Sequence, residues 1–158
     1  MIYWFIGQPG CGKTTLAKRL KKQFDVEGFC SIHLDGDGLR KIFEVPYTKE
    51  HLSKEYRIQQ TRCLQRFIAH CADQGVKVIV STVNPYRDVR EEFKNSRKDM
   101  IEIYVCCDGR VRKEFWVKDY EAPEVVDNKT KWINTEGKTE DESFELLLKT
   151  IPLVFECH

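Results

Sequence analysis

The stretch GQPGCGKT, from Gly7 to Thr14, constrains the fold and chemistry of this chain more than any other. It matches the pattern G-x-x-x-x-G-K-[S/T] in full, between the apolar run IYWFI and a segment with leucines at helical spacing. Glycines here let backbone N–H groups turn toward phosphate oxygens, and the positive end of a helix dipole attracts the same anion. A glycine loop formed by chance would rarely have both neighbours in register, so the pattern predicts a phosphate loop between a strand and a helix.

We expect this phosphate loop to bind a nucleoside triphosphate. Lys13 should reach the β- and γ-phosphates, and the Thr14 hydroxyl should be a ligand of Mg²⁺. Cys11 is either an oxidisable thiol near a helix N-terminus or a small filler, and we favour the filler. The motif alone does not separate a kinase from an ATPase or a GTP-dependent switch. The predicted nucleotide-binding residues are Gly7, Gln8, Pro9, Gly10, Cys11, Gly12, Lys13, Thr14 and Thr15.

The composition narrows the class of protein. A length of 158 residues suits one compact domain over residues 1–158. The 26 Lys and Arg residues nearly balance the 25 Asp and Glu residues, which argues against a nucleic-acid partner. No apolar run is long enough to span a bilayer, so we expect no membrane partner. The first residues are typical of a buried strand rather than a signal peptide, and seven cysteines without zinc-site spacing favour reduced thiols in a cytoplasmic protein.

The apolar pattern alternates between strand and helix periods, which predicts a parallel sheet with helices on both faces. Ser53 is an expected N-cap, and Thr139 with Glu142 fits a capping box. Residues 109–131 are polar and predict a loop or lid. The predicted elements are strands over 2–6, 30–34, 77–81, 100–106 and 132–134, and helices over 13–24, 53–74, 87–96 and 139–150.

The stretch LDGDGLR follows the second predicted strand as a loop, at the edge of the sheet where such proteins bind ligands. A calcium loop of the EF-hand type is excluded, because the spacing puts Arg40 where that loop needs glycine. A plain turn stays open as an alternative. The functional interpretation is that Asp35 or Asp37 accepts a proton from an attacking hydroxyl, with both near Mg²⁺ or its waters. Arg40 would then bind an anionic acceptor.

Five motifs in order, GQPGCGKTTLA, LDGDGLR, RIQQTR, STVNPYR and DYEAP, resemble those of the adenylylsulfate kinases over about residues 2–135. The resemblance implies an α/β, three-layer P-loop kinase fold with a parallel sheet flanked by helices and a short lid over about 108–124. It implies ATP and Mg²⁺ as cofactors, and transfer of the γ-phosphate to the ribose 3′-hydroxyl of adenosine 5′-phosphosulfate. Family analogy also allows a homodimer.

The resemblance assigns roles to individual residues. Asp37 is the candidate base, with Asp35 in support and Lys13 as the third catalytic residue. Arg40 and Arg57 are the expected ligands of the phosphosulfate end of the acceptor.

Other residues are expected near the base of the acceptor. Gln60 lies three positions after Arg57 on a predicted helix, so both share a face, whereas Arg62 and Arg66 are expected on an ordinary solvated face. Val83 and Asn84 would offer backbone groups to the base. Phe115 or Trp116 would stack on it, with burial in the core as the equal alternative.

Three further basic positions of the lid, Arg110, Arg112 and Lys113, would neutralise the transferring phosphoryl group. Arg87 could meet either a phosphate or a protein carboxylate. No Asp ends the third predicted strand, so the Asp-Gly-Asp stretch is expected to replace the Asp that commonly holds Mg²⁺ in P-loop proteins.

Four features depart from the family pattern: Gly38 and Gln60 replace Asn, Asn84 replaces Ser, and the lid is short. Three of them lie near the expected acceptor site, so a related kinase acting on a cytidine diphosphate conjugate in capsule biosynthesis is the alternative. A regulatory P-loop NTPase is less favoured, because no N-K-x-D signature is present. A binding module without turnover is disfavoured by the intact Lys13, Thr14 and Asp37.

Overall fold

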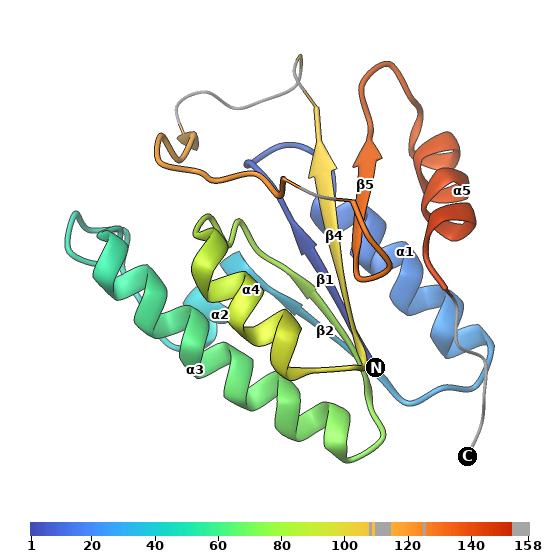
Figure 1. The fold of residues 1–158 in the computed structure, drawn as a ribbon, viewed down its shortest axis with the longest axis horizontal. Coiled ribbons are helices and arrows are strands. Elements are labelled where there is room, and N and C mark those ends of the chain that lie inside the picture. The colour runs from blue at the N-terminus through green and yellow to red at the C-terminus, as the bar shows by residue number, and fades with distance from the viewer. Residues whose placement is uncertain (108, 110–114, 125, 153–158) are drawn as a thin grey trace.

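The computed structural model of the chain describes residues 1–107, 109, 115–124 and 126–152. Its strands form one sheet in the order β2-β3-β1-β4-β5, and every pairing is parallel. Helices α3 and α4 lie on one side of this sheet and α1 and α5 on the other (Figure 1). The predicted three-layer α/β fold is therefore confirmed. In chain order the elements are β1 Ile2–Ile6, α1 Lys13–Val26, β2 Ser31–Asp35, α2 Gly36–Ile42, α3 Lys54–Asp73, β3 Lys77–Ser81, α4 Arg87–Ser96, β4 Met100–Cys106, β5 Thr130–Asn134 and α5 Glu140–Thr150.

The central strand β1 divides the core into two halves. Tyr3 and Phe5 point toward α1 and α5, while Ile2, Trp4 and Ile6 point toward α3 and α4. Alternate residues of a strand face opposite sides of its sheet, so a run of five apolar residues suits a strand covered on both faces. No described helix combines the length and the apolar character needed to cross a membrane.

Local signals at the helix ends behave as the sequence predicts. The Ser53 hydroxyl accepts a hydrogen bond from the Tyr56 N–H and caps α3. At α5 the Thr139 hydroxyl accepts from the Glu142 N–H, and the Glu142 carboxylate accepts from the Thr139 N–H, which confirms the capping box.

One element and several boundaries differ from the prediction; for example, α1 continues to Val26 rather than ending at residue 24. The segment after β2 was expected as a loop, but Gly36–Ile42 is the helix α2, and β2 ends at Asp35 rather than at residue 34. Asp35 caps α2 by accepting from the Gly38 N–H at 3.3 Å, which offsets the low helix propensity of two glycines. Strand β5 starts at Thr130 rather than at residue 132, because Thr130 already pairs in register with Glu102 of β4; its buried hydroxyl accepts from Lys94 Nζ at 2.7 Å.

A buried ion pair lies beneath α4. Arg90 and Glu102 are each 1% exposed, and Arg90 Nε donates to Glu102 Oε2 at 3.0 Å. Arg90 also donates to the backbone carbonyls of Asn84 at 2.8 Å and Glu121 at 2.6 Å. Burial raises the pKa of Glu102, against the attraction of Arg90 and Lys94. Three segments distant in sequence thus meet at one guanidinium.

We expect Glu102→Gln to lower the free energy of unfolding by about 3–5 kcal/mol, because it leaves the Arg90 charge buried without its partner. The substitution keeps the side-chain volume, so the loss reports the charge rather than a cavity. Urea denaturation measures it. The control is Glu92→Gln on the surface pair with Arg62, where a loss of about 0.2–1 kcal/mol is expected. Equal losses in the two variants would contradict the assignment.

Candidate active site

The phosphate loop joins the carboxyl end of β1 to the N-terminus of α1. Gly7 has φ of 139°, and a Cβ atom there would lie 2.2 Å from the Val105 carbonyl oxygen, so a side chain is excluded. Gly12, with φ of 90°, precedes the first residue of α1 in the left-handed region. The loop therefore lies at the positive end of α1, between a strand and a helix as predicted.

Lys13 is 8% exposed and bends back onto the loop that carries it. Its Nζ donates to the Gln8 carbonyl oxygen at 2.8 Å. Burial lowers the pKa of Lys13 to about 8, although the negative charges of Asp35 and Asp37 oppose the shift. The charges of both carboxylates act on the ammonium group, so the three residues predicted to be catalytic lie in the same region of the structure.

The Asp35 carboxylate connects the phosphate loop with the strand ends. Its Oδ1 accepts from the Thr14 hydroxyl at 2.8 Å and from the Ser81 hydroxyl at 2.9 Å. Burial by itself would raise the pKa of Asp35, but hydrogen bonds from Thr14, Ser81 and the Gly38 N–H outweigh it and lower that pKa. Asp35 is therefore a carboxylate anion at neutral pH, directly beside the predicted Mg²⁺ ligand.

Behind Ser81 lies a histidine that the sequence reasoning did not single out. His33 Nε2 is 2.8 Å from the Ser81 hydroxyl oxygen. Since the single Ser81 proton is donated to Asp35, Nε2 must be the donor in this contact. Burial lowers the pKa of His33, which favours the neutral ring.

The donor set around Thr14 suits Mg²⁺. A hydroxyl and a carboxylate are hard oxygen ligands of the kind that Mg²⁺ prefers. Among the described residues no three His, Cys, Asp or Glu side chains group to hold a metal, so the remaining ligands would be nucleotide phosphates and water. Ser81 ends β3, where P-loop proteins commonly have the Asp that holds Mg²⁺. Asp35 pairs in register with Ser81 from the neighbouring strand β2, so this carboxylate lies one strand away from that position.

Asp37 and Arg40, on α2, line a pocket of about 480 Å³ together with Tyr47. The Tyr47 hydroxyl donates to Asp37 Oδ1 at 2.6 Å, and the Arg40 guanidinium lies over the Tyr47 ring at 4.7 Å. Arg40 Nη2 donates weakly to the His51 carbonyl at 3.5 Å, while Nη1 is buried without a hydrogen-bond partner. Tyr47 was missed because a single aromatic residue in a polar loop carries no motif.

The predicted residues of α3, Arg57 and Gln60, lie in the first two turns of that helix. Arg57 is half-buried, and its Nε donates to the Leu52 carbonyl at 2.9 Å. Its charge also acts on Tyr86, whose pKa is raised to about 12 by burial and by a hydrogen bond with Asp119. Gln60 is exposed. No contact in the structure tests the predicted binding of an acceptor by Arg57 or Gln60.

The turn between β3 and α4 is held from inside. Asn84 is 6% exposed with φ of 43°, and its carbonyl accepts from Arg90. The Val83 carbonyl accepts from the Gly7 N–H at 3.4 Å. Both carbonyls therefore have a protein donor, and the predicted contact with an acceptor base would use a second lone pair or an N–H group.

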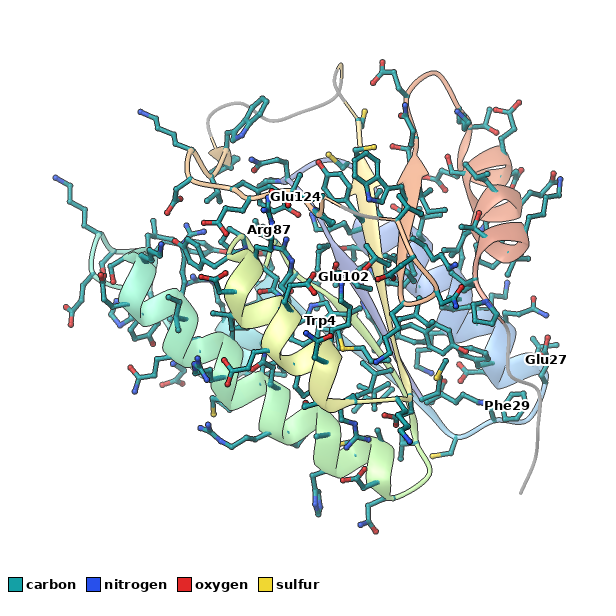
Figure 2. The ribbon with its side chains drawn as sticks, viewed as in Figure 1. Trp4, Glu27, Phe29, Arg87, Glu102 and Glu124 are labelled. Carbon is teal, nitrogen blue, oxygen red and sulfur yellow. The ribbon has the colours of Figure 1, made fainter. Side chains whose placement is uncertain are left out.

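The two alternatives for Arg87 are resolved in favour of a carboxylate. Arg87 Nη1 pairs with Glu124, and Nη2 donates to the Ala122 carbonyl at 2.9 Å (Figure 2). The Arg87 N–H donates to Glu121 Oε2 at 2.7 Å. Arg62 forms a surface pair with Glu92, which confirms its ordinary role. Arg87 thus fastens the far end of the lid.

Two aromatic residues of the lid are exposed rather than buried in the core. Phe115 is 60% exposed and Trp116 is 45% exposed, so the core alternative is wrong for both. Stacking on an acceptor base stays a prediction. The next residue, Val117, is buried and bonded through its backbone to the Gln8 side chain. The predicted phosphoryl ligands of the lid lie outside the described residues: Arg110, Arg112 and Lys113.

Cys11 packs inside the protein as the filler we expected. It is 3% exposed, and burial raises the pKa of its thiol, which disfavours the reactive thiolate. Among the described residues the cysteines form no disulfide: Cys11, Cys30, Cys63, Cys71, Cys106 and Cys107 are reduced thiols.

The comparisons with known proteins agree with this geometry. The family model described as adenylylsulphate kinase matches residues 1–123. The chain belongs to the adenylylsulphate kinase family. The family is one of ATP-dependent kinases, and the chain is an enzyme of that class.

Three relatives illustrate the range of the family. A probable adenylyl-sulfate kinase of Archaeoglobus fulgidus is 34% identical over 111 residues, covering 70% of this chain and 70% of that protein. A cytidine diphosphoramidate kinase of Campylobacter jejuni is 32% identical over 108 residues, covering 68% of this chain and 61% of that protein. The adenylylsulfate kinase of Mycobacterium tuberculosis, solved with AMPPNP and adenylylsulfate, shares the fold with a TM-score of 0.75 at 19% identity, covering 94% and 95% of the two chains.

ATP affinity should weaken as the pH rises above about 8, because free Lys13 loses its proton there while bound phosphates would hold the ammonium charged. One proton taken up on binding predicts a Kd that rises about tenfold per pH unit above that value. Calorimetry without an acceptor measures this slope. The variant Lys13→Arg keeps its charge, so its Kd should be weaker but flat over the same range. A flat wild-type Kd would contradict the prediction.

Proposed function

We propose that this kinase transfers the γ-phosphate of ATP to the ribose 3′-hydroxyl of adenosine 5′-phosphosulfate. The observation that carries the proposal is the pocket that joins Asp37, an exposed carboxylate near the phosphate loop, to Arg40, a cation with an unsatisfied nitrogen. A base and an anion ligand within one pocket suit an acceptor that has both a hydroxyl and a negatively charged end.

The donor side follows from the phosphate loop. Backbone N–H groups and Lys13 would hold the β- and γ-phosphates, so Lys13 would exchange the Gln8 carbonyl for phosphate oxygens. Thr14, kept in place by its hydrogen bond to Asp35, would hold Mg²⁺. When bound, Mg²⁺ neutralises charge on the transferring phosphoryl group.

On the acceptor side, Asp37 would take the proton of the attacking hydroxyl. That hydroxyl would replace or share the contact now made by the Tyr47 phenol. Arg40 is suited to a sulfate or phosphate oxygen, because its buried Nη1 has no hydrogen-bond partner. Arg57 would supply a second cation, and Gln60 a polar contact on the same helix. The aromatic residues Phe115 and Trp116 would cover the base, near Val83 and Asn84.

A second acceptor class has support of its own. The Campylobacter jejuni relative is a cytidine diphosphoramidate kinase at an identity similar to that of the adenylylsulfate kinases. Gln60 and Asn84 depart from the family pattern near the expected acceptor site. A cytidine diphosphate conjugate is therefore the alternative acceptor, with the same donor chemistry and the same base.

The proposal extends to the organisation of the protein. We propose that residues 1–158 form a single kinase domain with its lid over about 108–124. The substrate would be a small nucleotide, and the enzyme would act in the cytoplasm as a homodimer by family analogy.

With ATP and Mg²⁺ supplied, we expect adenylylsulfate to gain one phosphoryl group, which mass spectrometry detects. It should be phosphorylated faster than the other nucleotides of a panel. Transfer to cytidine diphosphate conjugates in place of adenylylsulfate would select the alternative. Release of inorganic phosphate with no phosphorylated acceptor would refute both and favour a regulatory NTPase.

We expect Asp37→Asn to lower kcat by about 10²- to 10⁴-fold, because the amide cannot take the hydroxyl proton. ATP should still bind, as calorimetry can show. Asp88→Asn is the matched control: Asp88 is also an exposed second residue of a helix, α4, but lies outside the pocket. Its kcat should stay near the wild-type value, and an active Asp37→Asn enzyme would exclude Asp37 as the base.

A further inference from the structure

The side chain of Gln8 forms a contact that phosphate binding does not require. Gln8 is 8% exposed, and its Nε2 donates to the Val117 carbonyl oxygen at 2.9 Å. Its Oε1 accepts from the Val117 N–H at 3.1 Å. One amide thus satisfies both backbone groups of a residue 109 positions away, as a neighbouring strand would.

The backbone carbonyl of Gln8 contacts the phosphate loop rather than the lid. It accepts from Lys13 Nζ at 2.8 Å, so one residue contacts both the phosphate-binding cation and the lid. A nucleotide that draws Lys13 onto its phosphates would release this carbonyl. The residue that holds Val117 is therefore also the one whose surroundings change when the loop is filled.

Val117 is the anchored residue next to the two exposed aromatic residues of the lid. Phe115 and Trp116 precede it directly. On the other side the chain is fastened again at Glu121, whose N–H donates to the Pro85 carbonyl at 2.9 Å. The contacts at Glu121 therefore cannot by themselves orient Phe115 and Trp116, since Val117 and the turn after it lie between them.

We propose that Gln8 is a positioning residue: it clamps Val117 to the phosphate loop and so holds Phe115 and Trp116 over the acceptor. The link to an acceptor rests on the proposed function. The clamp itself is a property of the protein without substrates. Removing the amide leaves the buried Val117 N–H unpaired and leaves its carbonyl only the longer hydrogen bond from the Tyr120 N–H at 3.3 Å, which favours release of the segment.

Hydrogen exchange tests the clamp without any substrate. In Gln8→Leu the Val117 amide should exchange about tenfold faster than in the wild-type protein, because its acceptor is gone and the segment opens more often. Gln8→Asn keeps the amide but shortens the side chain by one methylene, and it should show the same direction if the leucine variant folds poorly. An unchanged Val117 rate in a folded variant overturns the proposal.

The matched control is Gln65→Leu. Gln65, on α3, is 7% exposed. Its Nε2 also donates to a backbone carbonyl at 2.9 Å, that of Val89 on α4. This variant loses a buried amide contact of the same length away from the lid. It should leave the Val117 exchange rate at the wild-type value, and a matching acceleration would point to general destabilisation and overturn the clamp.

Steady-state kinetics then test the effect on the acceptor. Gln8→Leu should raise the acceptor KM about tenfold, which is more than it raises the ATP KM. Gln65→Leu should change neither KM. An acceptor KM that rises no more than the ATP KM overturns the positioning role. If the wild-type protein phosphorylates no nucleotide, the proposed function fails, and the exchange comparison alone decides whether Gln8 clamps Val117.

Discussion

The carboxylate of Asp35 is the contact on which the proposed site depends. It accepts from Thr14 of the phosphate loop, from Ser81 at the end of β3 and from the Gly38 N–H of α2. These hydrogen bonds keep Asp35 ionised despite its burial, and they fix where α2 begins. Because α2 carries Asp37 and Arg40, the position of the candidate base relative to the phosphates is set through Asp35. Asp35 is therefore a structural joint as well as a candidate Mg²⁺ neighbour.

The proposed acceptor side is organised by two guanidinium groups of α4, those of Arg87 and Arg90. Arg90, paired with Glu102 inside the protein, holds the turn at Asn84 and the lid at Glu121. Arg87 adds contacts to the lid from the surface. Together the two arginines connect α4 to residues 121–124, at the end of the lid that leads back to β5. Breaking these contacts would leave the buried Arg90 charge without partners, which is costly.

Features encoded in short stretches could be predicted from the sequence, and features that require distant partners could not. The phosphate loop, the cap at Ser53 and the alternation of strands and helices are local patterns. Helix α2 was missed because two glycines obscure a helix that exists through its cap on Asp35. The contacts of Arg90 with Glu102 and of Gln8 with Val117 join residues whose proximity follows from the assembled sheet; the only local sign was a glutamate inside an apolar strand.

The hydrogen bond from Tyr47 to Asp37 has a consequence for the enzyme that waits with ATP but without an acceptor. Burial and the neighbouring Asp37 raise the pKa of the Tyr47 phenol, so it keeps its proton at neutral pH. If Asp37 acts as the base, as proposed, a phenol at that carboxylate would occupy the position from which Asp37 would activate water. The Tyr47 side chain would then suppress wasteful hydrolysis of ATP. The acceptor hydroxyl would have to displace the Tyr47 phenol, rather than water, from the Asp37 carboxylate.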